Sequence, residues 1–216
     1  MKTYNYSKQK FNFKNLVTQY LNVSSLEFIH NEKDFNYKKK FERKNDQSTH
    51  YHQKFYNLAH SSDFLNVYNS FISEIVKPLF GEQIVYQKVP TFRLHFPGNI
   101  AVGEYHRDRE YRDLEWSKRV KEFNFFLPIT DAYNTNTIWL ESEEGKEDFS
   151  PMNVKHGQVV KWDGSNLLHG NKLNEEITSR VSFDFRVMPL SRYEPSNHGS
   201  INMNTSFSLG GYYTKI

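Results

Sequence analysis

The motif His106-Arg107-Asp108 and the distant His169 have the residue types that bind a redox-active transition metal. His106 and Asp108 are two residues apart, so in an extended segment their side chains leave one face while Arg107 leaves the other. Two imidazoles and one carboxylate around a ferrous ion leave positions open for O₂ and a further ligand. The pattern therefore predicts a 2-His-1-carboxylate metal site; an ordinary surface pair of His106 and Asp108 is the alternative.

The third ligand must come from elsewhere in the chain, and His169 is the leading candidate. Residues 157–164, which precede it, read as a strand running into a glycine turn. His156 and His198 are the next candidates if His169 is not the ligand.

A second motif, Arg180 with Ser182, favours an acidic small molecule beside the metal. Arg180 lies eleven residues beyond His169 and opens a stretch, residues 180–187, in which polar and apolar residues alternate. In a strand, Arg180 and Ser182 share a face. A guanidinium fork with a hydroxyl beside it suits the distal carboxylate of a dicarboxylate.

Taken in order, these motifs resemble the Fe(II)/2-oxoglutarate-dependent dioxygenases of the broad phytanoyl-hydroxylase-like branch. More narrowly, the chain is similar to the streptomycin-biosynthesis dioxygenase-like group. The similarity covers roughly residues 84–190, about half of the chain. Besides the metal and Arg180 motifs, it rests on residues 92–99, 124–132 and 136–142.

The resemblance implies a double-stranded β-helix, or jelly roll, with the metal between its two sheets. It implies that His106, Asp108 and His169 bind Fe(II), that Arg180 and Ser182 hold 2-oxoglutarate, and that O₂ is the oxidant. A halogenase of this superfamily would need a small residue in place of the metal carboxylate. Asp108 therefore argues for oxygen insertion or hydrogen abstraction.

Two further residues, Asn124 and Thr137, occupy positions from which such enzymes complete the cosubstrate pocket. The assignment of Asn124 has an alternative, in which its side chain is bonded to the backbone beside its own strand. We retain both interpretations at this point.

The elements that must position these residues are predominantly strands from residue 83 onward. Turn signals at residues 97–98, 144–145 and 163–164 separate short runs, and this pattern favours a mainly β jelly roll over an α/β fold. The seven expected strands are residues 84–89, 91–96, 101–108, 123–127, 137–141, 158–162 and 180–188.

The N-terminal third is expected to form covering helices. Ser61-Ser62-Asp63 offers an N-cap, and apolar residues then recur at helical spacing from Phe64 to Leu79. This helix should bury one face against the outside of the larger sheet. A weaker helix is expected at about residues 12–20, and the basic run 36–44 is either a solvated face or a phosphate site.

Length predicts one domain of 216 residues. We divide it into a mainly helical cover at 1–82, a jelly-roll core at 83–190 and a C-terminal extension at 191–216. The extension lacks clear periodicity, and residues 210–213 near its end either fold back over the barrel mouth or are loose.

Composition excludes several classes of function. The chain has no cysteine, which removes disulfides, zinc knuckles and thiol nucleophiles. Its start lacks an apolar signal core, and no run approaches 18 apolar residues, so we expect a cytoplasmic protein without a membrane partner. The formal charge of +3 permits an anionic small molecule and does not demand nucleic acid. The oligomeric state is not indicated.

Candidate substrate residues are Arg93, Arg109 and Arg112. Arg109 and Arg112 belong to a charged stretch, residues 109–121, directly after the metal motif, where a specificity loop is expected. A self-neutralising surface loop is the alternative. Arg93 shares a strand face with His95, for which a hydrogen-bonded structural role is the simpler interpretation.

We therefore expect an oxygenase that hydroxylates a polar small molecule. An activated sugar, such as a nucleotide sugar of a bacterial carbohydrate or natural-product pathway, is the first choice, and an amino-acid-like metabolite is the second. A cupin-like sugar isomerase or binding protein is the alternative outside the oxygenases. Arg180 and Ser182 discriminate, because neither cupin function needs a dicarboxylate clamp.

Overall fold

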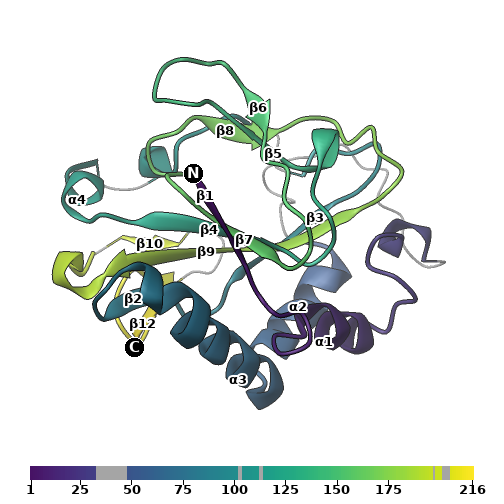
Figure 1. Cartoon of the computed structure of the whole chain (residues 1–216), viewed down its shortest axis with the longest axis horizontal. Helices are drawn as coiled ribbons and strands as arrows, with labels where there is room; N and C mark the ends of the chain where they lie inside the picture. Colours follow the sequence, from purple (N-terminus) through teal and green to yellow (C-terminus); the bar gives the residue numbers. More distant parts are fainter. Residues whose placement is uncertain (33–47, 102–103, 112–113, 197, 201–204) are drawn as a thin grey trace.

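The computed structural model describes residues 1–32, 48–101, 104–111, 114–196, 198–200 and 205–216. A smaller antiparallel sheet lies over one face of a larger one, and helices cover the opposite face of the larger sheet (Figure 1). The order of the larger sheet is β1-β7-β4-β9-β2-β12, with β3 also paired to β9, and that of the smaller is β6-β5-β8. The predicted mainly β jelly roll with N-terminal covering helices is confirmed.

The central strand of the larger sheet is β9, which pairs with β2, β3 and β4. The larger sheet contains β1 (Lys2–Asn5), β2 (Ile84–Gln87), β3 (Thr91–His95), β4 (Phe123–Pro128), β7 (Gln158–Trp162), β9 (Arg180–Pro189) and β12 (Tyr213–Lys215). The smaller sheet contains β5 (Ile138–Leu140), β6 (Ser150–Pro151) and β8 (His169–Asn171), and a separate pair is formed by β10 (Gly199–Ser200) and β11 (Thr205–Ser206).

Six of the seven expected strands form near their predicted positions, but the expected strand at 101–108 does not form in the residues described there. His106 makes a single bridge to His169. The Asp108 N–H then donates to the Gly164 carbonyl at 2.9 Å, and the chain enters a 3₁₀ turn, η5 (Asp108–Tyr111). The prediction of a strand was wrong because a local turn ends the pairing after one residue.

The main covering helix begins as predicted. The Ser61 hydroxyl accepts a hydrogen bond from the Phe64 N–H, which caps α3 (Ser62–Phe71). The helix then continues as a π-helical turn, η3 (Ile72–Val76), and a 3₁₀ turn, η4 (Lys77–Leu79). The apolar periodicity thus predicted one helical run, which the structure divides into three geometries.

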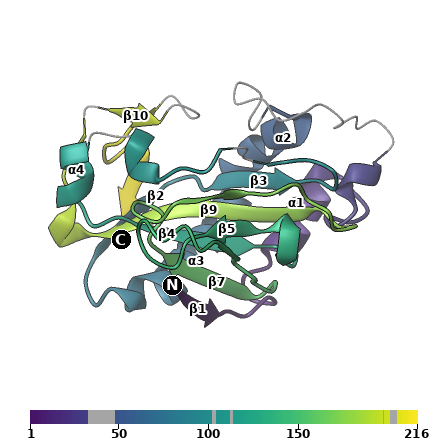
Figure 2. The ribbon, with the colours of Figure 1, turned by 90° about the horizontal axis from the view of Figure 1, so that it is seen from above.

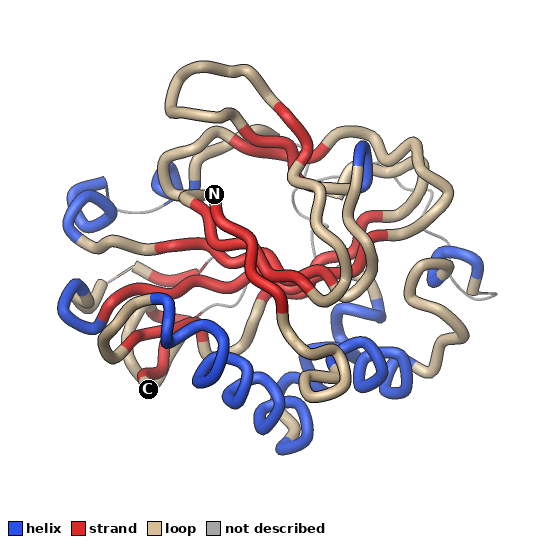
Figure 3. The backbone as a smooth tube through the Cα atoms, viewed as in Figure 1, coloured by secondary structure: helices blue, strands red, loops and turns tan. Residues whose placement is uncertain are grey.

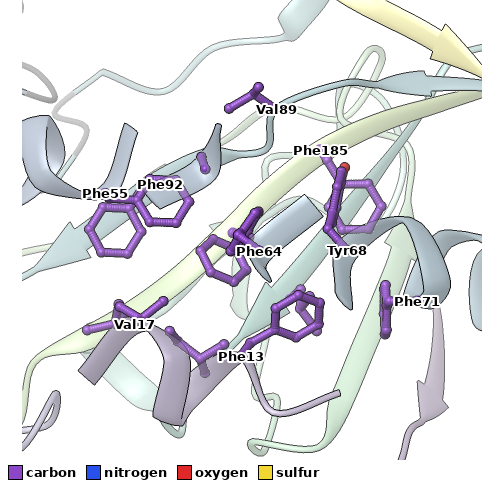
Figure 4. Packing of buried hydrophobic residues seen from close by; sticks show 14 of the residues in the cluster. Phe13, Val17, Phe55, Phe64, Tyr68, Phe71, Val89, Phe92 and Phe185 are labelled. Carbon is purple, nitrogen blue, oxygen red and sulfur yellow. The ribbon is translucent and has the colours of Figure 1, made fainter. Parts of the chain in front are cut away.

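This helix packs its aromatic face on the outside of β9, as expected. The rings of Phe64 and Phe183 lie 5.6 Å apart, as do those of Tyr68 and Phe185, and Phe71 also meets Phe185 edge-on. All five side chains are buried. Figure 4 shows the rings of Phe64, Tyr68 and Phe71 gathered with Phe185 in this core. The aromatic core therefore fixes β9 from the side opposite to the smaller sheet.

The other helices were predicted less completely. The weak helix expected at about 12–20 is α1 (Phe13–Leu21), whereas α2 (His50–Ala59) and α4 (Leu114–Arg119) were not predicted. Figure 2 shows α4 and β10 at the opposite end of β9 from α2. The basic run 36–44 lies outside the described residues. The described helices are too short or too polar to traverse a lipid bilayer.

Both ends of the chain add strands to the larger sheet (Figure 3). β1 pairs with β7, and β12 pairs with β2, so the C-terminal extension returns to the sheet edge. Tyr213, the first residue of β12, is fully buried. The tail is therefore neither a loose end nor only a cover for the barrel mouth, as the two sequence-based alternatives had it.

Candidate functional site

The fold brings the three predicted metal ligands together. His106 and His169 exchange both backbone hydrogen bonds, at 2.9 and 3.0 Å, which sets their side chains next to one another. The Oδ1 atom of Asp108 lies 3.6 Å from Nε2 of His106 and 3.9 Å from Nε2 of His169. The three ligand atoms lie within 4.8 Å of one another. One small ion therefore fits between them.

Backbone carbonyls orient both imidazoles. Nδ1 of His106 lies 2.9 Å from the Glu104 carbonyl, and Nδ1 of His169 lies 2.9 Å from the Leu167 carbonyl. A carbonyl oxygen only accepts, so Nδ1 carries the proton and the lone pair of Nε2 is available to a metal. Burial lowers the pKa of His169 to about 4, so its imidazole is neutral at physiological pH.

The carboxylate of Asp108 is held by its second oxygen. Oδ2 accepts hydrogen bonds from Asn124 Nδ2 at 2.7 Å and from Arg186 at 2.8 and 3.2 Å. Burial alone would raise the pKa of Asp108, but the positive charge of Arg186 and contacts with the two imidazoles hold it well below its ordinary value. Asp108 is therefore an anion with Oδ1 directed at the imidazoles. Two imidazole nitrogens and one anionic oxygen suit Fe(II).

A buried guanidinium lies in the same cavity. Arg180 is 1% exposed, its Nε donates to the Asn136 carbonyl at 3.0 Å, and its Nη1 donates to the Ser182 hydroxyl at 2.7 Å. Burial lowers the pKa of Arg180 to about 10, which still leaves it charged at neutral pH. Among the described residues no carboxylate forms an ion pair with it. The carboxylate of a bound ligand would compensate this buried charge.

One cavity joins the metal cluster to Arg180. Polar and charged side chains predominate in its lining. Its lining consists of Thr91, Arg93, His106, Asp108, Asn124, Phe125, Ile138, Trp162, His169, Gly170, Asn171, Arg180, Asp184, Phe185 and Arg186.

The residues proposed to complete the cosubstrate pocket differ in their placement. Asn124 lines the cavity, but its amide holds Asp108 and not the backbone of its own strand. Thr137 is fully buried outside the lining, and its hydroxyl donates to the Met152 carbonyl at 2.6 Å. Ser182 is also fully buried and reaches the cavity only through Arg180.

The candidate substrate residues also differ in whether they line the cavity. Arg93 lines the cavity and pairs with Asp184 through Nε at 3.2 Å. Arg109 points away from it, donating to Asn166 at 2.9 Å and pairing with Glu144 at 2.6 Å, as in the self-neutralising loop. Arg112 lies outside the described residues.

His95 is buried beside the cavity in a structural position. Its Nε2 lies 2.9 Å from the Asn99 carbonyl and its Nδ1 lies 3.1 Å from the Asn136 carbonyl. Burial, assisted by the charge of Arg180, lowers the pKa of His95 to about 3, although the carbonyl contacts oppose this shift. The two alternative metal ligands, His156 and His198, are absent from the cavity lining.

The most important residue that sequence reasoning missed is Arg186, which holds the Asp108 carboxylate. Asp184 on the same strand was also missed. The signal was present in the alternation after Arg180, because residues 180, 182, 184 and 186 share one face of a strand. What the alternation could not show is which of these side chains reaches Asp108, 78 residues away in the chain.

Known proteins resemble this chain to different extents. No family model matches the chain. The streptomycin biosynthesis protein StrG of Streptomyces griseus is 38% identical over 177 residues, which cover 81% of this chain and 80% of StrG. Among solved structures, AviO1 of Streptomyces viridochromogenes matches with a TM-score of 0.47 and 15% identity, over 89% of this chain and 91% of AviO1. The nickel complex of the non-haem monooxygenase ThoJ matches with a TM-score of 0.47 and 11% identity, over 86% and 71% of the two chains.

These two solved structures share 11% and 15% identity with the chain, against 38% for StrG. Membership of the phytanoyl-hydroxylase-like branch stays a prediction. The extent and identity of the StrG match establish that the chain belongs to the StrG family, as the resemblance of its motifs to the streptomycin-biosynthesis group predicted.

Proposed function

We propose that His106, Asp108 and His169 bind the Fe(II) of this oxygenase and that Arg180 binds the distal carboxylate of 2-oxoglutarate. The observation that carries the proposal is the placement of three convergent metal donors and one buried guanidinium in a single cavity. Bound Fe(II) supplies O₂ activation, in which 2-oxoglutarate is converted to succinate and CO₂ while the substrate is oxidised.

Other groups of the chain orient the imidazoles and the Arg180 guanidinium. The carbonyls of Glu104 and Leu167 keep the protons of the two imidazoles on Nδ1. Ser182 and the Asn136 carbonyl fix the Arg180 guanidinium, so that less conformational entropy is lost when a carboxylate binds. A dicarboxylate clamp of this kind has no role in a cupin-like isomerase, and we therefore favour the oxygenase.

For the substrate we propose a polar, sugar-derived small molecule of a natural-product pathway, hydroxylated beside the metal in the cytoplasm. The name of StrG, a streptomycin biosynthesis protein, supports this class. So do Thr91 and Asn171, whose polar side chains line the cavity. An amino-acid-like metabolite is the second candidate.

Charge in the cavity restricts where an anionic group of the substrate would lie. Arg93 pairs with Asp184, Arg186 pairs with Asp108, and Arg180 is assigned to 2-oxoglutarate. The reacting part of the substrate is therefore expected to be uncharged. The diphosphate of a nucleotide sugar would instead lie outside this cavity, where Arg109 could bind it only in competition with Glu144.

The metal assignment is tested by replacing each ligand with alanine. His106→Ala, Asp108→Ala and His169→Ala should each lower Fe(II) affinity sharply in anaerobic calorimetry, because two remaining donors bind a divalent ion much more weakly than three. The fold should persist, since the ligands sit on an already packed scaffold. His156→Ala is the matched control and should bind Fe(II) as the unmodified protein does. Unaltered binding by the His169 variant would show that the third ligand is wrong.

The substrate class is tested by measuring succinate formation with nucleotide sugars, free sugars and amino acids. A nucleotide sugar should stimulate turnover, and Arg109→Ala or Arg112→Ala should reduce that stimulation. The slow reaction without substrate should persist in both variants, because metal and cosubstrate contacts are intact. Stimulation by amino acids alone, equal in all variants, would refute the sugar proposal and support the second candidate.

A further inference from the structure

A connected set of polar contacts runs from the metal carboxylate to the C-terminal tail. Arg186 donates to Oδ2 of Asp108 through Nη2 at 2.8 Å and Nε at 3.2 Å. Its third nitrogen, Nη1, donates to the Tyr212 hydroxyl at 2.7 Å. The guanidinium is thus held between a candidate metal ligand and a residue of the C-terminal tail. The tail lies outside the sequence motifs that predicted the metal site and the 2-oxoglutarate site.

An acidic side chain completes the environment of Arg186. Oε2 of Glu122 lies 3.8 Å from Arg186 Nε, and its other oxygen accepts a hydrogen bond from the Tyr213 hydroxyl. Glu122, Tyr212 and Tyr213 are all buried. Two successive tail tyrosines therefore reach the same buried charge cluster, one directly and one through Glu122.

The tail is fixed in a single position by its own pairing. β12 pairs with β2 in the larger sheet, and the Tyr212 carbonyl accepts a hydrogen bond from the Lys88 N–H at 2.9 Å. The Tyr212 N–H donates to the Ser206 carbonyl at 3.0 Å. Gly211 allows this approach, because a Cβ there would lie 2.7 Å from the Ser206 carbonyl oxygen. Tyr212 is thus positioned by backbone contacts on both sides.

The orientation of Asp108 depends on these contacts. A carboxylate has two equivalent oxygens, and a metal can take one or both of them. Arg186 and Asn124 together satisfy Oδ2, which leaves Oδ1 directed at the two imidazoles. Hydrogen bonds to the second oxygen therefore favour coordination through Oδ1 alone and keep further metal positions open.

We propose that Arg186 and Tyr212 are positioning residues of the metal centre and that the C-terminal segment 205–216 is thereby an integral part of it. Tyr212 fixes the Arg186 guanidinium, and Arg186 fixes the Asp108 carboxylate for one-oxygen coordination. This inference rests on the proposed role of Asp108 as a metal ligand.

The test measures Mn(II) affinity by calorimetry and the coordination of bound Mn(II) by electron paramagnetic resonance. Arg186→Met should weaken Mn(II) binding by about 10- to 100-fold, the usual effect of removing a residue that orients a metal ligand. Arg186→Lys should recover part of this loss, because it keeps the charge near Oδ2 but loses the fork. Tyr212→Phe should give a smaller loss, of roughly 3- to 10-fold, and the Mn(II) spectrum should change in the same order.

A double variant separates positioning from general stability. Since Tyr212 acts through Arg186, Tyr212→Phe should cause no further loss of affinity in the Arg186→Met background. Tyr193→Phe is the matched control, because the Tyr193 hydroxyl accepts a hydrogen bond from the tail at the Leu209 N–H but has no contact with Arg186. It should leave Mn(II) affinity and spectrum unchanged.

Failure of this inference can be told from failure of the proposed function. If Asp108→Ala loses Mn(II) while folded Arg186→Met and Tyr212→Phe bind it with unchanged affinity and spectrum, the positioning role is refuted and the metal site stands. If Tyr193→Phe loses as much affinity as Tyr212→Phe, the tail acts only through packing. Full Mn(II) binding by Asp108→Ala would overturn both the metal assignment and this inference.

Discussion

The two faces of β9 differ in character: one is apolar and packs in the core, and the other is polar and lies toward the cavity. One face presents Val181, Phe183, Phe185 and Val187, all at most 1% exposed, and its two phenylalanines pack against other rings of the core. The other face presents Arg180 and the polar residues at 182, 184 and 186, which contact the cavity or its lining. Because side chains alternate at a period of two residues, one set of β9 residues packs in the apolar core and the other set faces the cavity.

Buried apolar groups and buried charged groups on this strand have different partners. The rings of the outer face are satisfied by α1, α2 and α3, so their contribution to stability is independent of any ligand. Arg180 on the inner face is buried with no described carboxylate in ion-pair contact, although Asp184 attracts it from further away, and full compensation of its charge depends on what binds. Substitutions on the two faces should therefore affect different measured quantities.

The largest effect is expected on the outer face. Phe183→Ala should lower the free energy of unfolding by about 3–5 kcal/mol, because it removes a fully buried ring that meets Phe13, Phe55 and Phe64. Urea unfolding measures the loss, and the 2-oxoglutarate affinity of the folded fraction should be unchanged. Phe28→Ala, at a position 44% exposed, is the control and should change stability by less than about 0.5 kcal/mol. A large drop in the 2-oxoglutarate affinity of folded Phe183→Ala would show that the two faces are not independent.

The next effect is expected at Arg180. Arg180→Leu should lower 2-oxoglutarate affinity by roughly one to two powers of ten, because hydrogen bonds to charged groups are worth about 1.5–3 kcal/mol. Calorimetric titration with 2-oxoglutarate in the presence of Mn(II) measures it, and Mn(II) binding itself should be retained. The 2-oxoglutarate affinity of Arg180→Lys should lie between those of Arg180→Leu and the unmodified protein, since lysine keeps the positive charge but cannot form two parallel hydrogen bonds. Equal 2-oxoglutarate affinity in all three proteins would refute the clamp and favour the cupin-like alternative.

A smaller effect is expected at buried His95, on the pH dependence of the free energy of unfolding. The pKa of His95 is lowered from 6.5 to about 3 by burial, so the unfolded chain binds a proton that the folded protein does not. Stability from this group is present above the unfolded pKa and is lost as pH falls from about 6.5 towards 3, at about 1.4 kcal/mol per pH unit. Urea unfolding between pH 7 and 5 should show a slope reduced by this amount in His95→Gln. The exposed His60, changed to Gln, should leave the slope unaltered, and a His95→Gln slope equal to that of the unmodified protein would contradict the prediction.

The features that could be predicted from sequence are those set by short-range rules. Ser61 caps α3 because a hydroxyl at that position reaches an N–H three residues on, and β9 forms because polar and apolar residues alternate from Arg180. The two-residue spacing of His106 and Asp108 identified candidate ligands even though the strand expected there does not form.

Tertiary structure alone decided the contacts between residues far apart in the chain. It directed Arg109 to Glu144 and away from the cavity, placed Thr137 behind the cavity wall, and paired β12 with β2. It also brought Arg186 to Asp108, which no local pattern could indicate. The strand periodicity and the chemistry available to the side chains could be read from the sequence, because both depend on residue types and on neighbours within a few positions. Which carboxylate each guanidinium meets depends on sheet register and on loop paths, and these are set by burial of the whole aromatic core.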